Sequence, residues 1–326
     1  MKQYQTLADS GVANLTQRST LDVGGSTTDK VFAEAIFASM PTTVIQEKGL
    51  MRRYEVPGQT DIISVPVFKN FNLTFTNLSG TGSDTGSIAP VTAHNAVEYM
   101  EIQPVLKTAG LFLTETAELL TNKTSFAIHV QEIANGTARH FDQTLLNETV
   151  LSETAVGTAY VYSANGFVAN GSVSAGSTLG PFDLSDAKAS LSSGSDVYAP
   201  NVVVMHPTQY NQFLQSTDLR NDTYRVSDKA TFVNGELVAY DGMQIVQTEL
   251  VNGVVGSATT SYLTSGHPVA VFNKEKSAAY AEKPAAQRVR TWNDIRRHGT
   301  YIYTDVMFEG KVLIPESIRI IRCADA

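Results

Sequence analysis

The chain has 326 residues, of which 42% are hydrophobic and only 17% are charged, and its net charge is −8. A chain of this length can bury a large core and suggests about two domains. The single cysteine, Cys323, excludes an internal disulfide framework, and no apolar run approaches the roughly 18 residues of a membrane span. The sequence also lacks a secretory signal pattern, so we expect a soluble protein that folds in a cytoplasm.

Charge is unevenly distributed along the chain. Residues 274–326 carry 10 Lys and Arg against 7 Asp and Glu, whereas the rest carries 14 against 25. A basic end on an acidic body indicates either a nucleic-acid patch or complementary surfaces that meet within or between subunits. Because the pI is near 5.3, we favour complementary surfaces over a nucleic-acid-binding face.

Residues 1–41 are predicted to be weakly structured at first and to contain one short amphipathic helix, "KVFAEAIFASM". Asp29 can cap this helix, which ends before Pro41. Such a short helix is marginal in water by itself. We therefore expect its apolar face, which includes Phe32 and Phe37, to dock on another surface.

The next segment changes to the two-residue periodicity of strands. "DIISVPVF" and "NFNLTFTNL" alternate apolar and polar residues, and "AVEYMEIQPVLKT" returns after the Gly- and Ser-rich stretch "SGTGSDTGSIAP". Alternation on both sides of such a stretch predicts a long hairpin-like excursion. An arm of this kind, about residues 54–106, has little core of its own and needs another surface to lie on.

A long helix is predicted over residues 125–148, "SFAIHVQEIANGTARHFDQTLLNE", after a short helix that Thr114 can cap. Its main stripe has helical spacing and comprises Phe126, Val130, Ile133, Thr137, Phe141 and Leu145. Ile128 and Leu146 lie well off this stripe, so a second side is also apolar. Two apolar sides predict a buried helix or one shared with neighbours.

Residues 156–270 are predicted to form a compact region. It would contain a helix starting at Asp183 or Ser185, a buried strand "NVVVM", and a helix that starts with Pro207 after His206. Asp241-Gly242 indicates a hairpin turn. From residue 269 onward five further segments resemble strands. The fold class is therefore α+β, without a βαβ rhythm and without repeats.

Catalytic and ligand-binding patterns are absent from the sequence. His129 and His140 are three helical turns apart and cannot share one metal ion. "GTGSDTG" at 80–86 imitates a phosphate loop but lacks the lysine and the strand–helix context. No nucleophile-elbow or CxxC pattern occurs. We predict no catalytic residue, cofactor or metal, and hence no enzyme.

One basic and aromatic cluster stands out, "RVRTWNDIRRH". It contains Arg288, Arg290, Arg296 and Arg297 around Trp292. These arginines could contact phosphates or carboxylates of a partner, or they could form the polar face of a strand pair.

At the long helix the sequence resembles the major capsid proteins of tailed viruses with the HK97-type fold. The resemblance is carried by "EIQPVLKTAGLFLTETAELLTNKTSFAIHVQEIANGTARHFDQTLLNET", which ends at Asp142 and "LLN". It extends to "GQTDIISVPVF", to "NVVVMHPTQYNQFLQSTD" with "GELVAYDGMQIVQTE", and to "YTDVMFEGKVLIPESIRIIR". These segments occur in the order of the family and cover nearly the whole chain.

The resemblance implies an N-terminal arm (1–41), an extended E-loop with its flanking strands (42–108), a peripheral domain built on a spine helix (109–155 and 271–326) and an axial domain (156–270). It also implies a virion protein, assembled in the host cytoplasm, that forms pentamers and hexamers of an icosahedral shell. The partners would be identical subunits, with portal, scaffolding and cement proteins as further candidates, and no membrane. Double-stranded DNA would be contained without sequence-specific binding.

Assembly residues follow from the apolar and basic positions of these segments. We expect interfaces to include Phe32, Phe37, Arg52, Arg53, Phe68, Lys69, Phe71, Phe75, Arg288, Arg290, Arg296 and Arg297. Some relatives cross-link an E-loop lysine to an asparagine, and Lys69 is the lysine at the corresponding place. No local signature identifies its partner, so cross-linking is not expected.

Three other functions remain open from the sequence. A bacterial nanocompartment shell of the encapsulin type would share the fold but enclose an enzyme. A secreted β-rich adhesin or fibre protein would be a stable monomer or trimer. An enzyme ranks third, because no convergent catalytic set is present.

Overall fold

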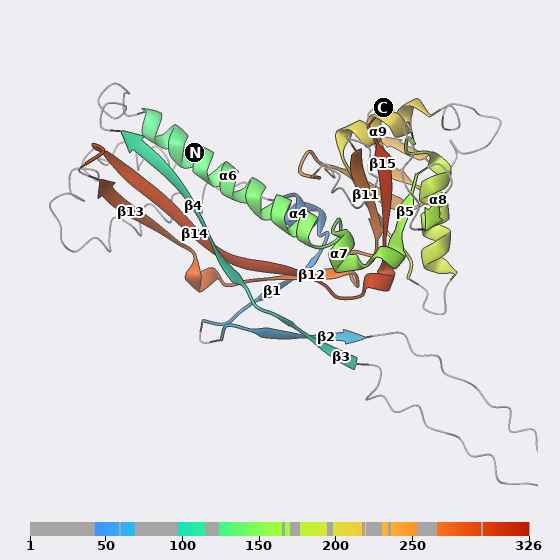
Figure 1. The fold of residues 1–326 in the computed structure, drawn as a ribbon, viewed down its shortest axis with the longest axis horizontal. Coiled ribbons are helices and arrows are strands. Elements are labelled where there is room, and N and C mark those ends of the chain that lie inside the picture. The colour runs from blue at the N-terminus through green and yellow to red at the C-terminus, as the bar shows by residue number, and fades with distance from the viewer. Residues whose placement is uncertain are drawn as a thin grey trace, which may run out of the picture.

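The computed structural model describes residues 43–58, 60–68, 97–114, 124–164, 167–169, 177–193, 198–216, 219, 230–233, 236–252, 266–294 and 296–325. The predicted N-terminal helix, the hairpin tip and the short helix predicted after Thr114 lie outside these residues. Within them, two sheets, a two-stranded ribbon and one long helix make up an elongated subunit (Figure 1).

The first sheet has five strands and is built around the long strand β14 (Gly299–Val312). One side of β14 pairs with β4 (Val105–Thr114) over its first ten residues. Its other partners are β13 (Arg288–Asp294) and then β12 (Ala278–Glu282), which is bordered by the parallel strand β1 (Arg52–Glu55). Segments more than 220 residues apart in the chain thus share one sheet.

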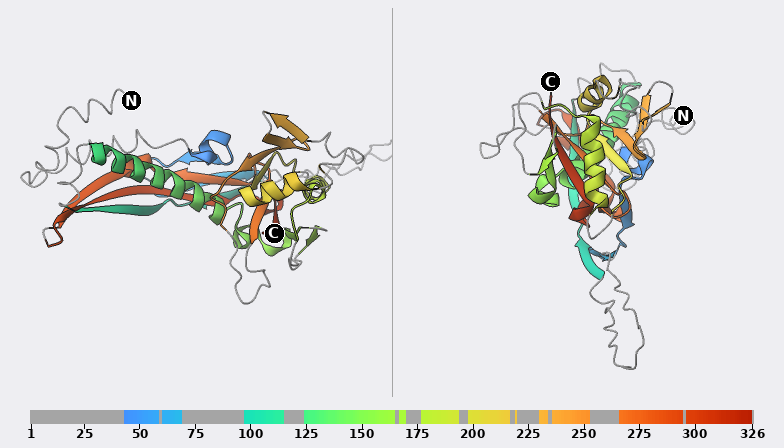
Figure 2. Two further views of the ribbon diagram at one scale, coloured as in Figure 1. Left: turned by 90° about the horizontal axis from the view of Figure 1, so that it is seen from above. Right: turned by 90° about the vertical axis from the view of Figure 1, so that its right-hand side faces the viewer.

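The predicted long helix is confirmed as α6 (Thr124–Glu148), which lies along one face of this sheet (Figures 1 and 2). Phe141 packs on Phe308, with ring centroids 4.6 Å apart, and edge-on against Tyr280. The helix approaches so closely that a Cβ on Gly310 would lie 2.7 Å from Cδ2 of Leu145. A side chain at residue 310 would therefore displace Leu145 and Thr149 from this helix–strand contact.

The second sheet has eight strands in the order β6-β5-β15-β11-β7-β10-β9-β8. Their bounds are β5 Val161–Ser163, β6 Val168–Ala169, β7 Val202–Met205, β8 Ala230–Val233, β9 Glu236–Tyr240, β10 Met243–Gln247, β11 Gly266–Phe272 and β15 Ile318–Ala324. Asp241 and Gly242 both have positive φ and join β9 to β10, which confirms the predicted hairpin.

Two helices and several short turns accompany this sheet. Helix α9 (Pro207–Gln215) starts where predicted, and β7 is fully buried. Helix α8 (Pro181–Ser192) starts before the expected Asp183, because that carboxylate accepts from the backbone N–H of Gly180 as the third helical residue. The remaining short elements are α7 Glu153–Val156, η2 Thr158–Tyr160, η5 Pro284–Ala286 and η6 Pro315–Ser317.

Strand β15 shows where the expected division of the chain is too simple. The resemblance places all of residues 271–326 with the long helix, but β15 pairs with β11 and β5 in the eight-stranded sheet. One core cluster joins the two regions: Phe141 and Leu146 of α6 share it with Val202 and Ile320 of that sheet. At Leu146 the second apolar side of the helix is thus covered from within the subunit.

The arm predicted over residues 54–106 is described at its base, as the ribbon of β2 (Ile63–Phe68) and β3 (Val97–Ile102). The ribbon extends away from both sheets (Figure 1). Its base nevertheless has a core, because Val65, Val67 and Ile102 are buried in a cluster with residues of the eight-stranded sheet and α8. The expectation that the arm cannot bury itself is therefore wrong for these residues.

The chain segment before β1 is held to the long helix by a buried carboxylate. Helix α4 (Val44–Lys48) presents the backbone N–H groups of Val44 and Ile45 to Asp142, at 2.6 and 3.2 Å. Asp142 is 3% exposed. No helix among the described residues has the length and hydropathy needed to cross a bilayer.

Candidate functional site

Among the described residues, no group of His, Cys, Asp or Glu is arranged to hold a metal ion. The candidate site is instead a surface of aromatic and basic side chains on the five-stranded sheet. Side chains alternate along a strand. Every second residue of β14 counted from Phe308 therefore faces α6, and the residues between them face the opposite side. The opposite face therefore carries Tyr301, Tyr303 and Asp305.

Cross-strand register gives this face three rows. We call it the aromatic face and define it as Phe112, Arg288, Arg290, Trp292, Tyr301 and Tyr303. Tyr301 lies between Phe112 and Trp292, with ring centroids 4.4 and 6.3 Å away. Tyr303 lies opposite Gly110, where a Cβ would be 2.8 Å from the tyrosine ring. The ring of Tyr303 thus lies over β4 at Gly110, where no side chain is in the way.

The third row is a buried acid beneath two arginines. Asp305 is fully buried and accepts hydrogen bonds from Nε of Arg288 at 2.8 Å, Nη2 of Arg290 at 3.0 Å and Oγ1 of Thr108 at 2.8 Å. Burial alone would raise the pKa of this carboxyl, but the three hydrogen bonds outweigh burial and hold the pKa below its usual value. One carboxylate thus neutralises only one of two guanidinium charges.

The aromatic face is open over its outer part. Trp292 is 65% exposed, and the side chains of Arg288 and Arg290 are 58% and 52% exposed. A large indole left in water beside cationic groups is unusual on a soluble surface and is typical of a contact region. Aromatic rings with surplus positive charge suit a partner segment that is apolar and acidic.

The structure brings together the arginines near the end of the chain. Arg288 and Arg290 lie on the aromatic face, and Arg296 and Arg297 lie in the turn between β13 and β14. Arg297 donates from Nη1 to the hydroxyl of Tyr301 at 2.8 Å. Arg288 and Arg290 thus form the polar side of a strand pair, and Arg297 contacts the hydroxyl of Tyr301. Contact of these arginines with a partner stays a prediction.

Arg52 and Arg53 lie elsewhere, on β1 at the opposite edge of the sheet. Arg53 donates from Nε to the buried Glu282 at 2.8 Å and also pairs with Glu55, so it holds its own sheet together. The side chain of Phe68 and the residues Phe32, Phe37, Lys69, Phe71 and Phe75 lie outside what the structure describes.

Sequence reasoning missed the tyrosines and Asp305. The alternation in "TYIYTD" places Tyr301, Tyr303 and Asp305 on one side of a strand, and this signal was available. What the sequence did not provide was the partner strand: β4 precedes β14 by almost 200 residues, so the contribution of Phe112 depends on long-range pairing.

The sequence and the structure were compared with known protein families and solved structures. Residues 98–313 match the family model described as phage capsid protein, and no curated protein matches the sequence. Solved structures share the fold at low identity. The capsid of Ralstonia phage GP4 has a TM-score of 0.59 and 9% identity over 89% of this chain and 91% of that one.

Two further structures show the same fold. The capsid of Cyanophage P-SCSP1u has a TM-score of 0.57 and 14% identity over 88% of this chain and 90% of that one. The SrpI encapsulin of Synechococcus elongatus has a TM-score of 0.55 and 12% identity over 88% and 91%. Family and fold point to a structural rather than a catalytic role. The chain belongs to the phage capsid protein family, and its fold is the α+β HK97-type capsid fold.

Proposed function

We propose that this chain is the major capsid protein of a tailed virus. Identical copies would form pentamers and hexamers, and these would close into an icosahedral shell around double-stranded DNA. The observation that carries this proposal is the exposed aromatic face of the five-stranded sheet, together with a ribbon that packs on its own subunit through one side and exposes Tyr99. Both features are surfaces that further copies of the chain can cover.

Shell formation would be stabilised by apolar contacts that repeat at every subunit. Tyr99 on the ribbon is 73% exposed, and Leu106 at the start of β4 is 46% exposed, besides Trp292. Buried apolar area contributes about 25 cal/mol per Å² before the losses of association are subtracted. One contact of this size is weak, but a closed shell repeats it at every subunit. Charged groups beside these residues would orient the partners more than hold them.

The net charge of −8 supports a shell that encloses DNA without binding it tightly. Assembly would take place in the host cytoplasm, and portal, scaffolding and cement proteins are further candidate partners. The domain division of the sequence analysis stays part of this proposal, with β15 assigned to the axial domain because it pairs there. A nanocompartment shell is the second candidate, since an encapsulin shares the fold.

Electron microscopy of the purified full-length chain tests this function. We expect rings of five and six subunits and closed shells at high protein concentration. Particles from the native source should contain double-stranded DNA. A single enclosed protein in place of DNA would establish the nanocompartment instead. A stable monomer or trimer at every concentration would contradict both shell functions and favour a fibre protein.

A further inference from the structure

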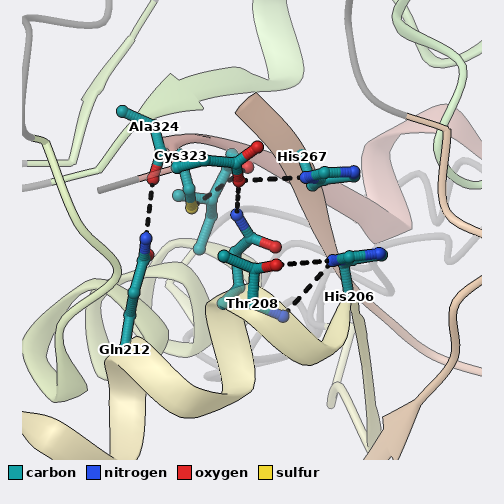
Figure 3. A network of polar contacts seen from close by, with 9 residues as sticks. His206, Thr208, Gln212, His267, Cys323 and Ala324 are labelled. Atoms are coloured by element: carbon teal, nitrogen blue, oxygen red, sulfur yellow. Dashed lines mark hydrogen bonds and ion pairs between the residues drawn. The ribbon is translucent and has the colours of Figure 1, made fainter. Parts of the chain in front are cut away.

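Two histidines are stacked at one end of the eight-stranded sheet, where β7 leads into α9 and β15 ends (Figure 3). The rings of His206 and His267 are 3.8 Å apart and within 5° of parallel. Nδ1 of His267 lies 2.9 Å from Oδ1 of Asp325. Since a carboxylate only accepts, this nitrogen of His267 carries a proton.

His206 is the N-cap residue of α9. Its Nδ1 accepts a hydrogen bond from the backbone N–H of Thr208 at 3.2 Å, and the hydroxyl of Thr208 lies 3.0 Å from the same nitrogen. A backbone N–H can only donate, so Nδ1 of His206 must carry a lone pair. The cap therefore requires the neutral ring, because a charged imidazolium has a proton on both nitrogens.

The first turns of α9 are also tied to the end of β15. Nε2 of Gln209 donates to Oδ1 of Asp325 at 2.7 Å, and Nε2 of Gln212 donates to the carbonyl of Ala324 at 3.0 Å. Gln209 is completely buried. His206, His267 and Asp325 thus belong to one small polar cluster that joins the helix to the last strand (Figure 3).

We propose that His206 is a pH-sensitive cap, whose protonation in mildly acidic solution releases the first turn of α9 from the end of β15. A proton on Nδ1 removes the cap bond from Thr208. It also places positive charge at the positive end of the helix dipole and beside the stacked ring of His267. The carboxylates that face His206 are Asp325 and Glu249, and they oppose this effect in part.

The direction of the pH effect follows from the same surroundings. Burial and the neighbouring His267 lower the pKa of His206, and these effects outweigh the two carboxylates. The imidazole of His206 therefore binds a proton more readily when the turn is released than when it is folded. The folded turn is stable above the ordinary histidine pKa of about 6.5 and loses stability as the pH falls toward the lowered value.

Hydrogen–deuterium exchange of the full-length chain tests the proposal. His206→Asn keeps a capping oxygen but cannot titrate. Wild type and variant are compared at the same pH, so that the intrinsic pH dependence of exchange cancels. We compare the exchange rates of the α9 amides as the ratio of the wild-type rate to the variant rate. This rate ratio should be near one at pH 7.5 and rise to about five at pH 5.5, the value expected for loss of one cap.

Two further variants complete the experiment. His140→Gln alters an exposed histidine of α6 and should leave the ratio for α9 independent of pH. His267→Asn can still donate to Asp325 but removes the stacked ring, so it should reduce the rise in acid, and it takes the place of His206→Asn if that variant fails to fold. A ratio for α9 that stays constant between pH 7.5 and 5.5 in both cap-region variants would overturn the proposal.

Discussion

Phe141→Ala is expected to lower the free energy of unfolding of the subunit by about 3–5 kcal/mol, the usual loss for a buried Phe truncated in a core. Phe141 is 7% exposed and packs against Phe308 and Tyr280, so its ring fills the space between α6 and the sheet. The close contact at Gly310 fixes the helix against β14 and prevents it from collapsing into the cavity. Urea denaturation followed by circular dichroism measures the loss.

The matched control for this variant lies two residues away. Arg139 is exposed on the same helix, and Arg139→Ala should change the free energy of unfolding by no more than about 0.5 kcal/mol. If the two variants were equally stable, α6 would not be held by its contact with the five-stranded sheet.

Asp142→Ala is expected to lower the free energy of unfolding by about 2–4 kcal/mol, because two buried N–H groups lose their acceptor and each such loss costs about 1–3 kcal/mol. The donors are the backbone N–H groups of Val44 and Ile45 at the start of α4. Protease sensitivity near α4 should increase as well, since the carboxylate fastens this helix to α6.

Asp142→Asn separates hydrogen bonding from general damage to the helix. Its amide oxygen can still accept from Val44, whereas its NH₂ group cannot accept from Ile45. The asparagine variant should therefore fall between wild type and the alanine variant in the same urea titration. Equal losses for asparagine and alanine would show that charge, and not the acceptor oxygens, holds α4 in place.

The features that the sequence could predict are local. The spacing of Phe141 and Leu145 predicted the long helix, and α6 ends at the expected Glu148. Asp241 and Gly242 determine their turn through two residues with positive φ, so that hairpin could be read directly. Helix α9 likewise starts at the predicted Pro207, immediately after His206.

The features that it could not predict depend on contacts between distant segments. Asp142 meets α4 across almost 100 residues, and β1 joins β12 across more than 220. Arg53 and Arg290 resembled each other in the sequence as basic residues. Arg53 pairs with the buried Glu282 and Arg290 with the buried Asp305, and Arg290 also lies on the aromatic face. Only the three-dimensional structure shows which acid each arginine contacts and which arginine belongs to the aromatic face.

We expect another copy of the chain to cover the aromatic face when the shell forms, and Trp292 reports on this contact directly. It is the only tryptophan in the chain and is 65% exposed in the subunit. Its fluorescence in purified shells is compared with that of dissociated subunits. We expect emission at a shorter wavelength and weaker quenching by acrylamide in the shell. Identical emission and quenching in closed shells and in dissociated subunits would contradict it.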